Sequence, residues 1–312
     1  MKSAVYLYRE FLLFVLTALV AIAALPCSSA SAQQIAFTWD DLPSHSSLPP
    51  GQNRVEIAKK IISAMQAAHM PPAYGFVNGA RTEDEPASTP VLKEWRDAGQ
   101  PLGNHTWSHV NLNEKTLADW EADLLKDEPL LQAYMGKSDW HWIRFPYLAE
   151  GDTPEKRIAV RKFLAGRGYK IAAVTMSFGD YMFNEPYARC VARNDSAGIA
   201  QLEKSYLGAA EAAFDYTREL SKAANGRDIP YVLLMHVGAL DAQLLPRLLD
   251  LYRAKGASFV SLEHAEGDPF YRNDLDLSLP ASPDTLGQAM QARGLLLPPQ
   301  PTLDLDLSTI CR

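Results

Sequence analysis

Residues 36–43 read A-F-T-W-D-D-L-P, an apolar run that ends in two adjacent carboxylates and a proline. The apolar residues within Gln34–Trp39 predict a strand, and Asp40 and Asp41 come at its carboxyl end. Two neighbouring negative charges repel each other unless a positive group lies beside them. The pair therefore predicts a cation or an arginine at the end of this strand, with further ligands supplied from elsewhere in the chain.

Outward from this stretch, short apolar runs alternate with stretches of helical period. The further predicted strands are Tyr74–Val77, Pro101–Asn104, Trp142–Phe145, Lys170–Thr175, Tyr231–Met235 and Ser258–Leu262. The predicted helices are Val55–Met70, Thr89–Ala98, Thr116–Tyr134, Thr153–Gly166, Gly198–Ala224 and Leu240–Arg253. This alternation predicts one α/β domain with a parallel sheet or barrel, in which ligands bind at the carboxyl ends of the strands.

The amino terminus has the pattern of a secretory signal. Lys2 and Arg9 precede an apolar run, Phe11–Leu25, and Ala30 and Ala32 fit the A-x-A cleavage pattern. A membrane anchor is the alternative, but this run is shorter than the roughly 20 residues that a span requires. We therefore expect a signal peptide over residues 1–32, no membrane span after its removal, and export to the periplasm or the exterior.

The remaining chain is expected to hold a catalytic domain at residues 33–268 and a Pro-, Asp- and Leu-rich wrapping tail at 269–312. Cys190 and Cys311 remain after cleavage, and an even pair in an oxidising compartment predicts a disulfide. Two unrelated buried thiols are the alternative. The net charge of −7 and the lack of a Lys/Arg cluster argue against a nucleic-acid partner.

Most ionisable residues that interrupt apolar sequence fall just after the predicted strands. Asp40 and Asp41 follow the first strand, and the remaining ones follow the third, fourth, fifth and sixth strands in turn: His105 with His109, Arg144, Asp180 and His236. Because the carboxyl ends of parallel strands share one edge, these side chains are expected to meet there.

His105 and His109 are spaced to bring two imidazoles together on one helical turn or a tight loop. Two imidazoles and one carboxylate form a common ligand set for catalytic Zn²⁺, which lowers the pKa of water towards about 7. One of Asp40 and Asp41 can be the third ligand, and the other is then free to act as a general base. We expect a divalent metal, with Zn²⁺ favoured over Co²⁺ or Ni²⁺.

Five short segments resemble, in order, the motifs of the polysaccharide deacetylase (NodB-homology) carbohydrate esterases: T-W-D-D, H-T-W-S-H, R-F-P-Y, G-D-Y and L-L-M-H. The resemblance extends from about Ile35 to Leu262. It implies a distorted (β/α) barrel of about seven parallel strands. It also implies a metal-dependent hydrolase that acts on carbon–nitrogen bonds and removes N- or O-acetyl groups from a carbohydrate.

By the same resemblance, the metal ligands are Asp41, His105 and His109. Asp40 is the general base, and Arg144 orients it.

The resemblance makes His236 the general acid that protonates the leaving group, and Asp180 its charged partner. The backbone N–H of Tyr147 binds the oxyanion, and Tyr181 and Leu233 line the acetyl pocket. A proton for the leaving group is what amide hydrolysis requires, since an amide nitrogen leaves poorly.

Several residues leave alternatives open. Trp107 is either a substrate platform or a packing residue. His45, in the proline-rich loop 43–51, either contacts the metal or substrate or lies in solvent. The family has glycine where this chain has Leu42, so we expect Leu42 to change the floor of the site.

These departures also leave the substrate open. Hydrolysis of a small amide or imide is the main alternative to glycan deacetylation. An inactive glycan-binding protein is a weaker alternative, because every motif residue that the chemistry needs is present.

Overall fold

The computed structural model describes residues 32–281 and 285–312, and the chain divides into two units, Met1–Ala32 and Gln33–Arg312. The predicted signal peptide lies outside the described residues, apart from Ala32, and stays a prediction. None of the helices in the described ranges is long and apolar enough to cross a membrane. The description below concerns Gln33–Arg312.

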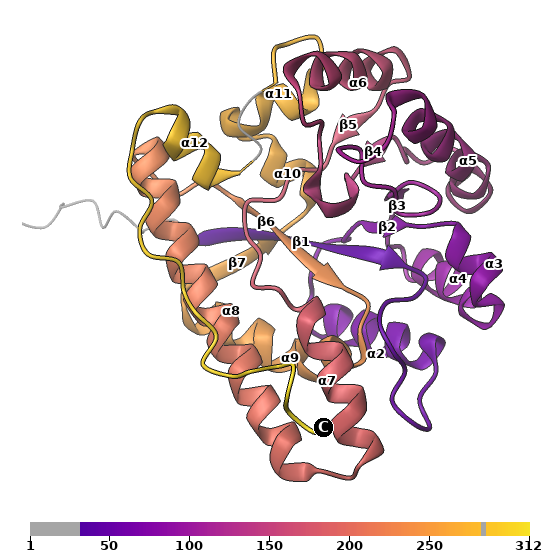
Figure 1. The fold of residues 1–312 in the computed structure, drawn as a ribbon, viewed down its shortest axis with the longest axis vertical. Coiled ribbons are helices and arrows are strands. Elements are labelled where there is room, and N and C mark those ends of the chain that lie inside the picture. The colour runs from indigo at the N-terminus through magenta and orange to yellow at the C-terminus, as the bar shows by residue number, and fades with distance from the viewer. Residues whose placement is uncertain (1–31, 282–284) are drawn as a thin grey trace, which may run out of the picture. The chain divides into compact units, whose positions relative to one another are not determined.

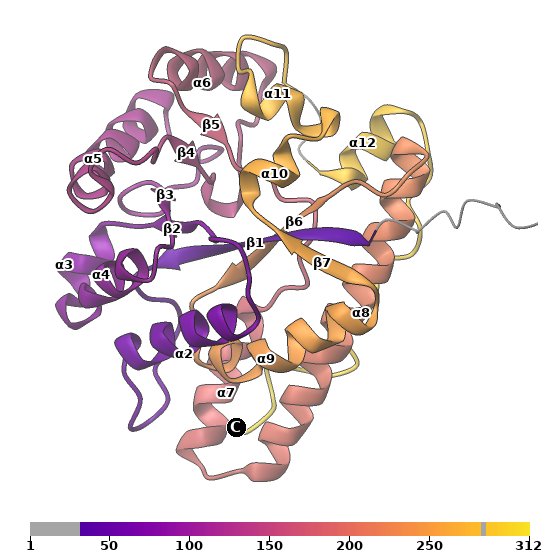
Figure 2. The same cartoon turned by 180° about the vertical axis from the view of Figure 1, so that it is seen from behind.

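Seven parallel strands form one curled sheet, in the order β5-β4-β3-β2-β1-β6, with β7 also paired to β1. Their bounds are β1 (Gln33–Leu42), β2 (Gly75–Val77), β3 (Leu102–Asn104), β4 (Trp142–Ile143), β5 (Lys170–Ile171), β6 (Tyr231–His236) and β7 (Ala257–Val260). The predicted parallel α/β sheet is confirmed, and Figures 1 and 2 show helices around its outside.

In the described residues, helices α2 to α9 lie between strands along the chain, and α10 to α12 follow the last strand, β7. Their bounds are α2 (Arg54–Ala67), α3 (Ala80–Asp84), α4 (Pro90–Asp97), α5 (Leu117–Met135), α6 (Pro154–Gly166), α7 (Tyr181–Ala192), α8 (Ser196–Asn225), α9 (Ala239–Ala254), α10 (Leu262–Glu266), α11 (Arg272–Leu275) and α12 (Leu286–Ala292). Short 3₁₀ turns are η1 (Pro86–Ser88), η2 (Pro146–Leu148) and η3 (Pro269–Tyr271). The six predicted helices are present within a few residues of their expected ends.

Threonine side chains cap two of the predicted helices but not a third. The side chains of Thr116 and Thr153 accept hydrogen bonds from the first turns of α5 and α6. Thr89 makes no such bond, because its own backbone is already helical (φ −49°, ψ −39°) where η1 runs into α4.

β1 is the longest strand and organises the sheet. Its residues Ile35–Asp40 pair in register with Tyr231–His236 of β6. Since side chains alternate along a strand, one face of β1 carries Phe37 and Trp39 and the other carries Thr38 and Asp40. Phe37 meets the ring of Tyr252 in α9, and Trp39 meets Trp95 in α4. The outer face is therefore sealed by helices, and the inner face is left for polar side chains.

The segment after β5 closes the curl of the sheet. A strand over Lys170–Thr175 was expected, but β5 ends at Ile171. The N–H groups of Thr175 and Met176 donate instead to the carbonyl of Val232 in β6, at 3.1 and 3.0 Å. The chain thus crosses from β4 towards β6 and brings opposite ends of the sheet together. This is the distorted barrel that the resemblance implies.

The last residues return along α8 to α7 (Figure 1). The predicted Cys190–Cys311 disulfide is present, with 5.0 Å between the two Cα atoms. Cys190 lies in α7. No helix was predicted from the sequence over Tyr181–Ala192, where α7 lies. The last strand is shorter than the predicted Ser258–Leu262, because β7 ends at Val260 and Leu262 begins α10.

Candidate metal and catalytic site

A bulge at the end of β1 aims both carboxylates at the site. β1 pairs with β2 through Trp39↔Gly75 and Leu42↔Val77, so β1 uses one more residue than its partner. Asp41 takes a left-handed conformation with φ 63°, which aspartate tolerates better than most residues. This breaks the alternation of the strand, so Asp40 and Asp41 both face the rim.

The same bulge returns Leu42 to the outer face of the sheet. Gly75 and Val77 share one face of β2, so their partners Trp39 and Leu42 also share a face. A Cβ added to Gly75 would lie 2.6 Å from Cδ2 of Leu42, which shows where that side chain packs. Leu42 thus packs on the outer face, away from the site whose floor it was expected to change.

Three predicted metal ligands converge. The buried Oδ1 atom of Asp41 has no hydrogen-bond partner, and it lies 3.5 Å from Nε2 of His105 and 3.4 Å from Nε2 of His109. Nδ1–H of His105 donates to the carbonyl of Arg144 at 2.6 Å, which leaves the lone pair on Nε2. Two imidazole nitrogens and one carboxylate oxygen fit a divalent cation such as Zn²⁺.

Electrostatics keep these ligands in the forms that a metal needs. Burial lowers the pKa of His109 to about 4, so its imidazole is neutral at pH 7. Burial alone raises the pKa of Asp41, but the hydrogen bond from His45 and the charge of His236 outweigh it. The pKa of Asp41 is held well below its usual range, so the carboxylate is ionised.

The two histidines sit on a tight turn outside any helix, with Thr106 at φ 57° and His109 at φ 56°. Two buried asparagines hold this turn. Asn78 donates to the carbonyls of His105 and Thr106, and Oδ1 of Asn104 accepts from the N–H of Thr106 at 2.8 Å. Sequence reasoning missed both asparagines, although each is an amide placed at a strand end.

Asp40 is fixed by Arg144 in the interior. Nη1 of Arg144 donates to Oδ1 of Asp40 at 3.0 Å, and the guanidinium also binds Thr38 Oγ1 and the carbonyl of Ala172. Arg144 is fully buried, so these hydrogen bonds hold its planar guanidinium group in one orientation. The second oxygen of Asp40 lies 3.7 Å from Nε2 of His105, at the edge of the metal cluster. Thr38 was not predicted from the sequence as a site residue, although residues two apart in a strand share a face and Thr38 lies two before Asp40.

His236 and Asp180 form a buried pair. Nδ1 of His236 lies 3.1 Å from Oδ1 of Asp180, whose other oxygen accepts the backbone N–H of His236 at 2.6 Å. Burial alone lowers the pKa of His236, but the charge and hydrogen bond of Asp180 and the nearby Asp41 raise it to about 10. His236 is therefore protonated at neutral pH, with Nε2 left for a substrate.

A second buried layer supports Asp180. Asn184 of α7 and Tyr206 of α8 both donate to the carboxylate of Asp241 in α9, at 2.7 Å each. Burial and the charge of Asp180 raise the pKa of Asp241 to about 7. These residues link the three helices behind the His236–Asp180 pair, and no sequence motif marks them.

Two of the three residues predicted to bind the oxyanion or the acetyl group lie at the site, and the third does not. Tyr147 and Tyr181 lie at the rim: their rings are 4.6 Å from His109 and 5.4 Å from His236, and both are exposed. The prediction for Leu233 is wrong, because it pairs with Phe37 and shares the outer face. Leu234, paired with Thr38, is the residue on the face of His236.

Trp107 contacts the scaffold beside the site. Its ring lies under the ammonium of Lys126, with the nitrogen 4.1 Å from the ring centroid. A Cβ added to Gly79 would lie 2.3 Å from this ring, so the indole fills the space that the glycine leaves. These contacts favour the packing alternative over the substrate platform.

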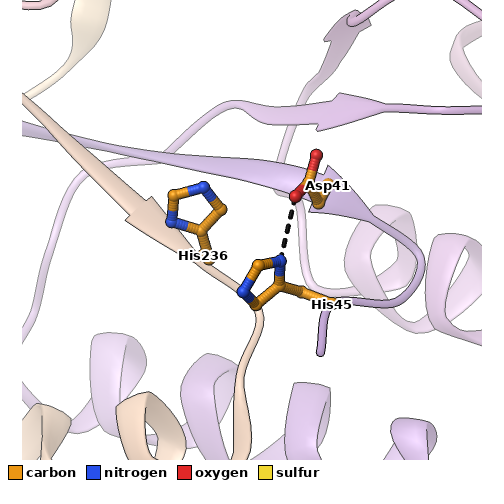
Figure 3. A group of neighbouring side chains, drawn as sticks. All are labelled: Asp41, His45 and His236. Carbon is orange, nitrogen blue, oxygen red and sulfur yellow. Dashed lines mark hydrogen bonds and ion pairs between the residues drawn. The ribbon is translucent and has the colours of Figure 1, made fainter. Parts of the chain in front are cut away.

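His45 reaches the site from the loop after β1. Its Nδ1 atom lies 2.9 Å from Oδ2 of Asp41, and its ring is 4.6 Å from the ring of His236. Figure 3 shows His45 alongside both residues. The solvent-exposed alternative is wrong, because the side chain is largely buried at 15% exposure.

Comparisons with known proteins bear on the family and the fold of this chain. Residues 28–163 match the family model described as "Polysaccharide deacetylase". This range includes Asp40, Asp41, His105, His109 and Arg144 and ends before Asp180 and His236. None of the curated protein sequences matches the chain.

Solved structures share the fold. A chitin deacetylase from the fungal pathogen Colletotrichum lindemuthianum is 22% identical, with a TM-score of 0.52 over 77% of this chain and 89% of its own. A CE4 family pseudoenzyme from Bacillus anthracis is 14% identical, with a TM-score of 0.51 over 75% of this chain and 66% of its own. A mutant of that pseudoenzyme with restored activity is also 14% identical, with a TM-score of 0.52 over 75% of this chain and 68% of its own. The resemblance to the polysaccharide deacetylase family is thus confirmed, by sequence over residues 28–163 and by fold over about three quarters of the chain.

Proposed function

We propose that this protein is an exported, divalent-metal-dependent hydrolase that removes acetyl groups from a carbohydrate, with N-acetyl groups as the principal target. One observation carries the proposal: the Asp41–His105–His109 cluster lies between the Asp40–Arg144 pair and the His236–Asp180 pair. A nucleophile-activating centre, a base and an acid are what amide hydrolysis requires.

Asp41, His105 and His109 would hold the cation, which when bound lowers the pKa of water and polarises the acetyl carbonyl. Asp40, held by Arg144, takes the proton of the attacking water. The N–H of Tyr147 donates to the carbonyl oxygen as negative charge develops there.

His236 then donates its Nε2 proton to the leaving nitrogen. Asp180 keeps the imidazolium charged and oriented, because both of its oxygens bind His236. Leu234 and Tyr181 lie beside His236, and we assign them to the wall that receives the acetyl methyl group. The Asp180 carboxylate thus orients the general acid His236, and Arg144 orients the general base Asp40.

Export is supported by the disulfide, since such bonds persist in oxidising compartments. The pattern of residues 1–32 agrees with it. The inactive alternative finds less support: the fold also occurs in a pseudoenzyme, but here the base, the acid and all three ligand residues are present and converge.

The test is metal-dependent release of acetate from oligomers of N-acetylglucosamine. Protein stripped with a chelator should be inactive, and one equivalent of Zn²⁺ per chain should restore acetate release. His105→Ala should lose both bound metal and activity. Acetate release that persists in chelator-stripped protein would refute metal dependence, and full metal content in His105→Ala would refute the ligand assignment.

A further inference from the structure

The loop that carries His45 is anchored from α2. Nη1 and Nη2 of Arg54 donate to the carbonyls of His45 and Ser46, at 2.7 and 2.6 Å. Nε of Arg54 donates in turn to Glu85 at 3.0 Å, and the Arg54 side chain is only 10% exposed. A buried guanidinium held on three sides fixes the backbone at the residue that enters the site.

The two carboxylate oxygens of Asp41 have different neighbours. Oδ2 faces Nδ1 of His45, and Oδ1 faces the Nε2 atoms of His105 and His109. An ionised carboxylate only accepts hydrogen bonds, so Nδ1 of His45 carries the hydrogen and donates it. The contact therefore removes Oδ2 from competition for a cation.

We infer that His45 is a positioning residue for the metal centre, whose Nδ1–H holds Oδ2 of Asp41 so that Oδ1 alone is offered to the cation. This inference rests on the ligand set of the proposed function. A hydrogen-bonded partner that orients a metal ligand commonly changes metal affinity by about 10–100-fold when it is lost.

A competing arrangement uses the same residues. Asp41, His45 and His236 could together hold a second cation, and Nε2 of His45 is buried without a hydrogen-bond partner (Figure 3). The direct 2.9 Å contact between Nδ1 and Oδ2 favours the hydrogen bond. Nδ1 of His236 is also already bound to Asp180, in the role that the proposed function gives this pair.

Substitution of His45 by asparagine or by glutamine tests which of its two ring nitrogens acts on the metal centre. Asparagine places its Nδ2 near the position of the histidine Nδ1, whereas glutamine extends its amide towards the position of Nε2. The control is Ser47→Ala, an exposed residue of the same loop. Zn²⁺ affinity is measured by competition with a chelator, and stoichiometry by elemental analysis, after circular dichroism confirms folding.

We expect wild-type protein and Ser47→Ala to bind one equivalent with equal affinity. His45→Ala should still bind one equivalent, with affinity weaker by about 10–100-fold. His45→Asn should recover most of the loss and His45→Gln little of it. The absorption of the Co²⁺-substituted protein should show the same number of imidazole ligands in wild-type protein and His45→Ala.

Equal affinities of wild-type protein and His45→Ala would overturn the inference and leave the proposed function standing. A second equivalent that is lost in His45→Ala would assign the residue to a second cation site. Better recovery by His45→Gln than by His45→Asn would make Nε2 the functional atom. Metal retained in full by His105→Ala would overturn the ligand set of the proposed function itself.

Discussion

At the scale of single residues, Asp40 and Asp41 face the same site only because the strand is bulged between them. A regular strand would send one carboxylate to each face. The sequence predicts the pair and its need for positive charge, since both follow from composition at a strand end. It does not predict the bulge, because the extra residue is defined by pairing with β2. It also does not predict the hydrogen bond of His45, which depends on how Arg54 holds the backbone of the loop.

Asp40→Asn should keep the metal and lose turnover. The amide preserves the size of the side chain and an acceptor for Arg144, but it cannot take a proton from water. We expect acetate release to fall on the order of 10²–10⁴-fold, with an unchanged metal content by elemental analysis. Loss of metal together with activity would show instead that Asp40 is a ligand.

His236→Ala should slow amides more than activated esters. An amide nitrogen needs a proton to leave, whereas a good leaving group does not. We expect a loss on the order of 10²–10⁴-fold for an acetamido sugar and a much smaller loss for an acetate ester of a nitrophenol. Equal slowing of both substrates would reduce His236 to a binding or structural residue.

The raised pKa of His236 also predicts how stability depends on pH. Burial lowers the pKa of this group, but the charge and hydrogen bond of Asp180 outweigh it and raise the pKa from its ordinary 6.5 to about 10 on folding. Its folded state binds the proton more tightly, so its stabilising effect is complete below pH 6.5 and is lost as pH rises towards 10. In metal-free protein, the gap in unfolding free energy between wild type and His236→Gln should shrink over this range in urea titrations. A gap that stays constant from pH 6.5 to 10 would contradict the assignment.

At the scale of elements, the sequence predicts β1, β6 and the long helices well, because each has local periodicity and most have local caps. It misses α7, which starts without a side-chain cap. Asp180 occupies the capping position, but its carboxylate binds His236 instead. It also misses the early end of β5, because the residues that follow bond to β6, far away in the sequence. Elements at the site are harder to predict, because a side chain that could cap a helix, such as Asp180, binds another site residue instead.

The disulfide between α7 and the carboxyl-terminal segment should stabilise the fold. It joins residues 121 apart, and closing so long a loop is worth about 4–5 kcal/mol in the chain-entropy account. In a chain that begins at Gln33, denatured without reductant, no thiol should react with Ellman's reagent. Cys311→Ser should lower the midpoint of urea unfolding. Two reactive thiols in the unreduced protein would contradict the bond.

At the scale of the whole molecule, the barrel brings together groups that are remote in sequence. Asp40 and Arg144 are separated by 104 residues and lie 3.0 Å apart. The sequence predicts this meeting because the carboxyl ends of parallel strands share one edge. It does not identify the substrate, which depends on loops such as 43–51. The same fold also occurs in a pseudoenzyme, so fold alone leaves activity to the site residues.

The central claim, metal-dependent loss of acetyl groups, is tested most directly by mass-spectrometric scoring of acetyl groups. The panel contains chitin oligomers, peptidoglycan fragments, acetylated xylan and small cyclic imides. Each is incubated with Zn²⁺-loaded wild-type protein, with chelator-treated protein and with Asp40→Asn. We predict that the Zn²⁺-loaded wild type removes acetyl groups from at least one glycan, while the other two preparations do not. Unchanged glycans beside a hydrolysed imide, with one equivalent of metal bound, would contradict the claim and favour the small-imide alternative.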